Sequence, residues 1–120
     1  MEITYNKLVR DRIPEIIELK GDKAFFSILA EEDYLYALNN KLREEMDEYL
    51  ESGEAEELAD ILEVLEAICG AIGVNPSQLF KLKEEKAKER GSFKKRIFLE
   101  TVSIKDQGKG AESPLDENPI

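Results

Sequence analysis

Apolar side chains recur at spacings of three and four residues in two consecutive stretches of the chain, residues 32–51 and 54–72. In the first stretch they form one stripe, which consists of Leu35, Leu38, Leu42, Met46 and Tyr49. This spacing predicts an amphipathic helix. Only Ser52 and Gly53 separate the two stretches. A break this short predicts that the two helices are antiparallel neighbours in a hairpin.

The second of these helices is apolar around most of its circumference. Its apolar residues are Leu58, Ile61, Leu62, Val64, Leu65, Ile68, Cys69 and Ile72. A helix of this kind has to be covered on more than one side. We therefore expect a central helix or an oligomer interface. Cys69 is the single cysteine, and we expect it to be a core residue rather than a nucleophile.

Two further helices follow from start and stop signals. Ile13-Pro14-Glu15 opens a short helix with proline in its first turn, and Gly21 ends it. Asn75 is a typical N-cap residue with Pro76 at the first helical position, and this helix is expected to run to Arg90.

Two short stretches, residues 23–29 and 94–102, are rich in aromatic and β-branched side chains and are predicted to pair as strands. Residues 103–120 contain glycine and proline but no aromatic residue, and we expect them to be a disordered tail. The predicted fold is mainly all-α, a helical bundle built on the hairpin with a small two-stranded β element, in one domain over residues 1–102.

The bulk composition narrows the class of protein. A chain of 120 residues with 42% hydrophobic residues is enough for one core. Its net charge of −10 argues against binding to nucleic acid polymers or to anionic membranes. No apolar run is long enough to cross a bilayer, and residues 1–12 lack the apolar segment of a secretory signal. We expect a cytoplasmic protein. The aromatic residues expected in the core are Phe25, Phe26, Tyr34, Phe80 and Phe93.

The negative charge is concentrated in the predicted hairpin. Residues 31–66 contain 14 acidic residues but only Lys41 and Arg43 as bases, a local charge of −12. Glu45 and Glu48 lie one turn apart on the first helix, and Glu57 and Asp60 repeat this spacing on the second. Four carboxylates from a helical hairpin would form a cage of oxygen ligands, which suits Mg²⁺ or Mn²⁺.

The position of Glu45 bears on this metal hypothesis. Glu45 lies beside the apolar stripe, where a carboxylate costs several kcal/mol unless a cation or hydrogen bonds compensate it. The competing interpretation is that the acidic residues are simply a solvated helical face, because such pairs are common on protein surfaces. The chain has no histidine, which excludes His bases and His-ligated zinc, and it has no EF-hand loop.

A basic segment follows the hairpin at residues 81–96. It contains Lys81, Lys83, Lys86, Lys88, Arg90, Lys94, Lys95 and Arg96 against three acidic residues. Magnesium and basic side chains together bind phosphates, so the acidic and basic segments could be complementary halves of one site. The basic residues could equally pair with acidic residues on a neighbouring helix.

The acidic motifs resemble those of the MazG-like, all-α NTP pyrophosphohydrolases. Glu44-Glu45-Met46-Asp47-Glu48 matches the motif of one helix in that family, and Glu57-Leu58-Ala59-Asp60 matches that of the next. The flanking residues 5–15 and 89–100 resemble those of a predicted house-cleaning branch of the same superfamily. The resemblance covers about residues 3–102.

This resemblance implies Mg²⁺-dependent hydrolysis of a nucleoside triphosphate between its α and β phosphates, with Mn²⁺ as an alternative ion and a homodimer or homotetramer as the assembly. The implied metal ligands are Glu45, Glu48, Glu57 and Asp60. The implied catalytic carboxylates are Glu44 and Glu45, with Glu44 supporting the metal site or orienting the attacking water. The candidate phosphate contacts are Lys86, Arg90, Arg96, Lys7 and Arg10.

Two alternatives remain open at this point. One is phosphoribosyl-ATP pyrophosphohydrolase activity, which belongs to a related fold and uses the same metal chemistry. The other is a non-catalytic acidic interaction module that binds a basic partner.

Overall fold

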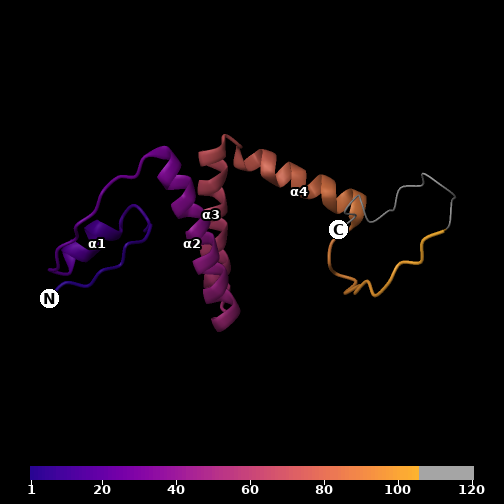
Figure 1. Ribbon diagram of the computed structural model, residues 1–120, viewed down its shortest axis with the longest axis horizontal. Coiled ribbons are helices and arrows are strands. Elements are labelled where there is room, and N and C mark those ends of the chain that lie inside the picture. The colour runs from indigo at the N-terminus through magenta and orange to yellow at the C-terminus, as the bar shows by residue number, and fades with distance from the viewer. Residues whose placement is uncertain (106–120) are drawn as a thin grey trace. The chain divides into compact units, whose positions relative to one another are not determined.

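The computed structural model describes residues 1–105 of the chain (Figure 1). It contains four helices in this range: α1 (Ile13–Leu19), α2 (Glu31–Ser52), α3 (Ala55–Ile72) and α4 (Pro76–Arg90). The mainly α-helical fold class is confirmed, and each helix lies close to its predicted bounds. None of the helices in the described range combines the length and the apolar character needed to span a bilayer. From residue 106 on, the predicted disordered tail lies outside the described residues.

The chain divides into two compact units, Met1–Leu79 and a second that begins at Phe80. The first unit contains α1, α2 and α3, and the second contains most of α4. The assignment of one domain to residues 1–102 stays a prediction.

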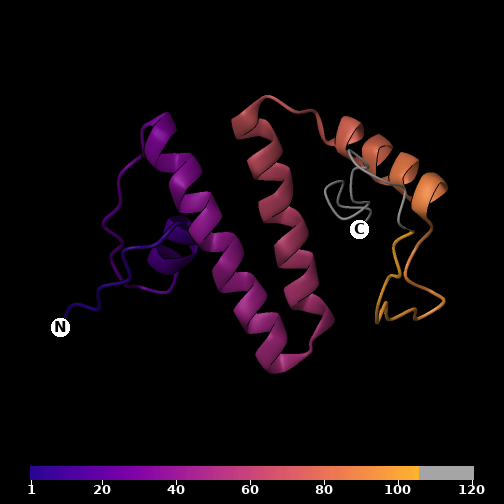
Figure 2. The same cartoon turned by 45° about the vertical axis from the view of Figure 1, so that its right-hand side comes forward.

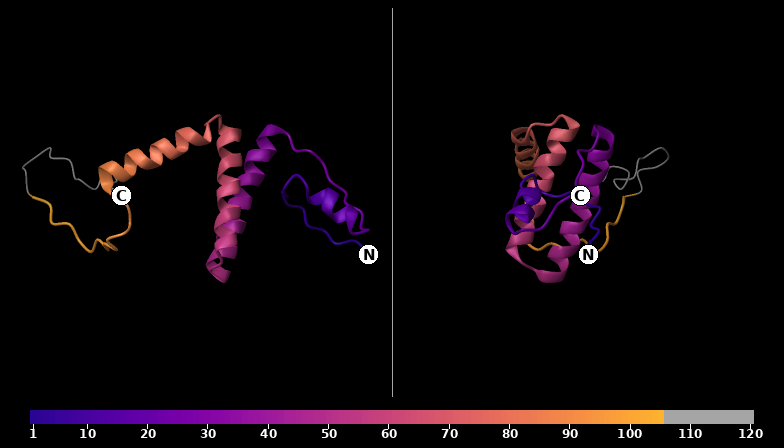
Figure 3. Two further views of the ribbon diagram at one scale, coloured as in Figure 1. Left: turned by 180° about the vertical axis from the view of Figure 1, so that it is seen from behind. Right: turned by 90° about the vertical axis from the view of Figure 1, so that its left-hand side faces the viewer.

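Helices α2 and α3 form the predicted antiparallel hairpin and lie side by side along their lengths (Figure 2 and Figure 3). Gly53 ends α2 with a positive φ of 69°, and its N–H donates to the carbonyl of Tyr49 at 2.7 Å. The hydroxyl of Ser52 then accepts the N–H of Glu54 at 3.1 Å. Glycine adopts this left-handed conformation without steric cost, which is why the chain can reverse here.

The end of α3 and the start of α4 are capped by side chains and glycine in the expected way. Gly73, at φ 79°, ends α3, and the N–H of Val74 donates to the Cys69 carbonyl at 2.8 Å. At the start of α4, Asn75 Oδ1 accepts the N–H of Ser77, and Gln78 Oε1 accepts the N–H of Asn75, both at 2.9 Å. This reciprocal pair is a capping box, so the position of the helix start follows from local sequence.

The core of the first unit is small and lies between α2 and α3. Leu38, Val64 and Cys69 are its fully buried apolar residues, which confirms the core location of Cys69. Met46 was predicted to lie in the apolar stripe but is 43% exposed. The stripe instead passes through Glu45, which is buried, because the spacing from Leu38 to Glu45 is two helical turns.

Many apolar side chains remain exposed, contrary to prediction. Of the five aromatic residues expected in the core, only Tyr34 is partly buried, and the exposed ones are Phe25, Phe26, Phe80 and Phe93. On α3, whose packing partner in its unit is α2, the uncovered residues are Leu58, Leu62 and Ile72. One helix can cover only one face of α3, so the remaining apolar positions are left in contact with solvent.

The two predicted strands do not form in the described part of the chain. Residues 23–29 have no regular secondary structure, and residues 94–102 begin with a turn. Arg96 has φ 56° and its N–H donates to the Phe93 carbonyl at 3.2 Å, a geometry incompatible with an extended strand. A pair of strands without further cover is at best marginally stable, so the aromatic and β-branched composition of these segments gave a wrong prediction.

Candidate functional site

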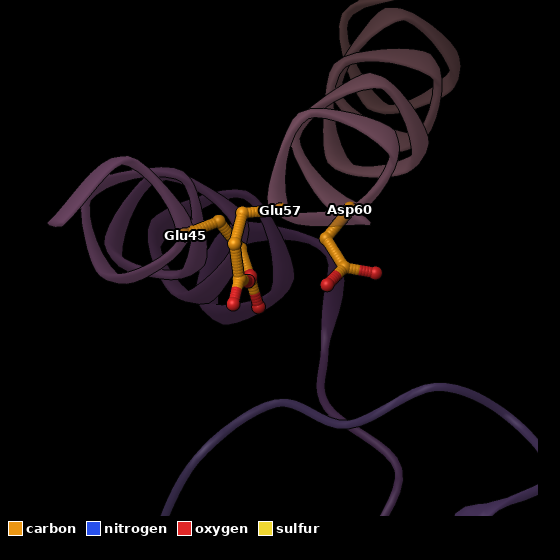
Figure 4. A group of neighbouring side chains, drawn as sticks. All are labelled: Glu45, Glu57 and Asp60. Atoms are coloured by element: carbon orange, nitrogen blue, oxygen red, sulfur yellow. The ribbon is translucent and has the colours of Figure 1, made fainter. Parts of the chain in front are cut away.

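Three carboxylates from the two helices of the hairpin converge beside the α2–α3 seam (Figure 4). They belong to Glu45 on α2 and to Glu57 and Asp60 on α3, and their ligand oxygens lie within 4.8 Å of one another. Figure 4 shows the side chains of Glu45 and Glu57 ending next to each other, with Asp60 beside them. We call these three residues the acidic triad. The short reversal at Gly53 brings the two motifs together, as the spacing of the sequence predicted.

Glu45 is the member of the triad whose environment is least expected for a charged group. It is 6% exposed, and it is the one charged residue among residues 1–105 that is buried. Its Oε1 lies 3.4 Å from Lys41 Nζ, whereas its buried Oε2 has no hydrogen-bond partner. Burial raises the pKa of Glu45, and the negative charge of Glu48 raises it further, while Lys41 opposes both. An unpartnered buried oxygen of this kind is destabilising unless a cation or a donor meets it.

Glu44 lies next to the triad but is already engaged with two lysines. Its Oε1 accepts a hydrogen bond from Lys7 Nζ at 2.9 Å and lies 3.5 Å from Lys41 Nζ. The hydrogen bond from Lys7 lowers the pKa of Glu44, and the same bond raises the pKa of Lys7. A carboxylate with a lowered pKa is a weaker base, so this geometry favours a supporting role for Glu44 over proton abstraction.

Besides Lys7, the N-terminal segment contributes Arg10 to the site. Arg10 Nη2 lies 2.7 Å from Asp60 Oδ1, an ion pair between residues fifty positions apart in the chain. Lys7 and Arg10 were predicted as phosphate contacts on the basis of resemblance. The structure places both beside the acidic residues of the hairpin.

Lys41 is a site residue that the sequence analysis missed. It contacts both Glu44 and Glu45 and is only 18% exposed. Its spacing was a usable signal, because a lysine three and four residues before two glutamates faces them on a helix. Lys41 is also one of only two bases between residues 31 and 66.

The other predicted site residues are not part of the acidic triad. Glu48 is exposed on α2 and acts on Glu45 only through its charge. Lys86 and Arg90 on α4, and Arg96 after it, belong to the second unit and are exposed. Their role as phosphate contacts stays a prediction.

A small hollow of about 100 Å³ lies beside Glu44 at the junction of the N-terminal segment and α2. Its lining combines amide, ammonium and aliphatic groups, from Asn6, Lys7, Leu8, Ala37, Asn40, Lys41 and Glu44. Such a lining can accept a small polar group, such as part of a phosphate or a sugar.

The acidic triad fits a hard divalent cation by the chemistry of its donors. Three carboxylates from two helices supply oxygen ligands, which Mg²⁺ and Mn²⁺ prefer. Glu45 differs from an ordinary surface carboxylate, because its buried Oε2 has no hydrogen-bond partner among the described residues.

Comparison of the chain with models of known protein families, with curated proteins and with solved structures gives no match.

Proposed function

We propose that the chain is a Mg²⁺-dependent nucleoside triphosphate pyrophosphohydrolase that cleaves between the α and β phosphates and removes modified or surplus nucleotides. Mn²⁺ is the alternative ion. The observation that carries the proposal is the buried Glu45, which groups with Glu57 and Asp60 and has one oxygen, Oε2, without a hydrogen-bond partner. Burying a carboxylate in this way costs stability, and a bound divalent cation would offset that cost.

In this proposal, acidic residues bind the metal ion and basic residues bring positive charge to the polyphosphate. Glu45, Glu57 and Asp60 would hold the ion, with Glu48 at the edge of the site. A bound Mg²⁺ would neutralise phosphate oxygens and lower the pKa of a coordinated water. Lys7 and Arg10 bring positive charge to the exposed side of the triad, where a polyphosphate would approach. Glu44 would hold Lys7 in position by accepting its hydrogen bond.

The uncovered apolar residues of the first unit support a homodimer or homotetramer. Leu58 and Leu62 on α3 are 45% and 57% exposed. Burying such side chains between subunits would stabilise the assembly by roughly 25 cal/mol per Å² of apolar surface. A monomer in light scattering at working concentration would contradict this part of the proposal. A cytoplasmic location, where nucleoside triphosphates and magnesium are present, is part of the same proposal.

The test is a panel of NTPs, dNTPs, modified nucleotides and phosphoribosyl-ATP, each incubated with the protein and Mg²⁺ and analysed by mass-resolved products. We expect pyrophosphate and a monophosphate from at least one nucleotide. Selective turnover of phosphoribosyl-ATP would instead identify the related activity. Release of pyrophosphate no faster than with Asp60→Asn would rule out catalysis by this site.

Two neighbouring residues provide a matched pair of variants. Glu57→Gln removes a member of the triad, whereas Glu56→Gln removes the adjacent, exposed charge. We expect Glu57→Gln to lower activity by about 10- to 100-fold or more, as the loss of residues around a metal does, and Glu56→Gln to have little effect. Equal losses in the two variants would point to general electrostatics. Absence of a stoichiometric Mg²⁺ site sensitive to Glu45→Gln would favour the non-catalytic acidic interaction module.

A further inference from the structure

One oxygen of the acidic triad is already occupied by a cation of the protein itself. Arg10 Nη2 lies 2.7 Å from Asp60 Oδ1, so the guanidinium neutralises a carboxylate that a divalent cation bound to the triad would also use. Two cations a few ångströms apart repel strongly in a partly buried site. Arg10 and a divalent cation therefore compete for Asp60.

The attachment of Arg10 to the site is weak enough to be reversed. Arg10 is 56% exposed and Asp60 37%, and exposed ion pairs of this kind change an equilibrium constant by only about two- to five-fold. Within the first unit, helix α1 buries none of its residues and packs against no other helix. The segment that carries Arg10 is thus not locked to the hairpin by a core of its own.

The second ion pair of the segment involves a residue outside the triad. Lys7 donates to Glu44, which is not one of the three converging carboxylates, and Leu8 next to it is partly buried. A cation bound to the triad does not compete for Glu44 directly. Lys7 can therefore keep the segment at the site while Arg10 leaves Asp60.

We propose that Arg10 is an internal counter-ion of Asp60 that a divalent cation displaces, and that the displaced guanidinium then binds a phosphate of the substrate. This inference rests on the proposed function and adds an order of events to it. Metal binding comes first and makes Arg10 available. A guanidinium is well suited to the second role, because its planar donors match phosphate oxygens in pairs.

The direct test is calorimetric titration of Mn²⁺ and of Mg²⁺ into the metal-free full chain at low ionic strength. Arg10→Gln removes the competing cation, so we expect it to bind the metal roughly two- to five-fold more tightly than the wild type. Arg12→Gln is the matched control, since Arg12 lies two residues away and pairs at 3.2 Å with Glu15 of α1, the helix that it precedes. We expect its metal affinity to equal that of the wild type.

The outcomes separate this inference from the proposed function. If the wild type binds metal and Arg10→Gln binds it no more tightly, the displacement is wrong while the metal site stands. If Arg12→Gln tightens binding as much as Arg10→Gln, the effect is one of overall charge and the displacement is again wrong. If the wild type has no stoichiometric metal site, both the proposed function and the displacement fail. Circular dichroism of each variant checks that the helices are retained.

A second titration tests the phosphate role of Arg10 without turnover. With saturating Mg²⁺, inorganic pyrophosphate should bind about ten-fold more weakly to Arg10→Gln than to the wild type, because a charge-assisted hydrogen bond is lost. Arg12→Gln should behave like the wild type. Unchanged pyrophosphate binding in Arg10→Gln would overturn the second half of the proposal.

Discussion

Two positions on one face of α2 are buried to nearly the same extent but have opposite chemistry. Leu38 is 3% exposed and Glu45 is 6% exposed, and their spacing of seven residues amounts to two helical turns. Leu38 belongs to the apolar half of the α2–α3 seam, together with Cys69. Glu45 belongs to the acidic half near Gly53, together with Glu57 and Asp60.

The difference shows that helical phase decides burial while the residue type decides what burial costs. Removing the Leu38 side chain from water stabilises the hairpin, whereas removing the Glu45 carboxylate from water without a partner for Oε2 destabilises it. Violations of the usual pattern of apolar interior positions are expected at functional sites. The acidic half is therefore the part of the hairpin in which burial of a side chain costs stability.

The largest change in the free energy of unfolding should come from a substitution in the apolar half. Leu38→Ala is expected to lower the free energy of unfolding by about 2–5 kcal/mol, since it removes buried methyl groups and leaves a cavity in a small core. Chemical denaturation followed by circular dichroism measures it. Leu50→Ala, on the same helix but 76% exposed, is the control and should change stability by less than about 0.5 kcal/mol. An equal loss at Leu50 would mean that another subunit covers that residue.

The next largest change in the free energy of unfolding should be an increase, and it should come from a substitution in the acidic half. Glu45→Leu is expected to raise the free energy of unfolding of the metal-free protein by about 1–3 kcal/mol, because an apolar side chain replaces a buried, incompletely paired carboxylate. The same variant should lose the calorimetric Mg²⁺ signal. Glu51→Leu, at an exposed position of α2, serves as the control and should leave both properties nearly unchanged. A destabilised Glu45→Leu protein would show that the carboxylate has stabilising partners in solution.

Local signals in the sequence were enough for the helices and for the three residues of the triad, although Glu48, which was expected with them, is not part of it. Gly53 and Gly73 mark helix ends because each takes a positive φ, and Asn75 marks the start of α4 through its cap. The convergence of Glu45 with Glu57 and Asp60 followed from helical spacing and a short connection. These features depend on residues close together in the chain, where periodicity and turn chemistry are informative.

Features that join distant segments could not be predicted in the same way. The pairs Lys7–Glu44 and Arg10–Asp60 link residues 37 and 50 positions apart, and no periodicity relates an extended segment to a particular helix face. Met46 was misplaced for a related reason. Its apolar side chain fits a stripe by type, but the packing against α3 selects the phase that buries Glu45 instead.

The third prediction uses pH to change the charge of the acidic half while the apolar half stays constant. Burial raises the pKa of Glu45 above its ordinary value of 4.5, so the folded state binds a proton more readily than the unfolded state. Stability of the metal-free protein should therefore fall as pH rises from 4.5 through the raised pKa, and the loss should be complete above it.

Comparison of two variants in urea denaturation from acidic to neutral pH isolates this effect. Glu45→Gln should lack the fall, and Leu38→Ala should keep it. The pair of Glu44 with Lys7 acts in the opposite direction, because the pKa of Glu44 is lowered and its stabilisation is lost as pH drops through that lowered pKa. If the stability of the wild type and that of Glu45→Gln depended on pH in the same way in this window, the burial of the charged Glu45 carboxylate would be contradicted.

The smallest expected change in stability comes from an ion pair and depends on the salt concentration, unlike the change from the apolar half. Lys7→Gln removes an ion pair whose partners are 43% and 29% exposed, so its cost to stability should be small at low ionic strength. At about 0.5 M salt the cost should nearly vanish, because exposed charges are screened over a few ångströms. The cost of Leu38→Ala should change far less between the two conditions, since it arises from packing. A Lys7→Gln cost that persisted in high salt would show that packing around Leu8, rather than the ion pair, holds the N-terminal segment to the hairpin.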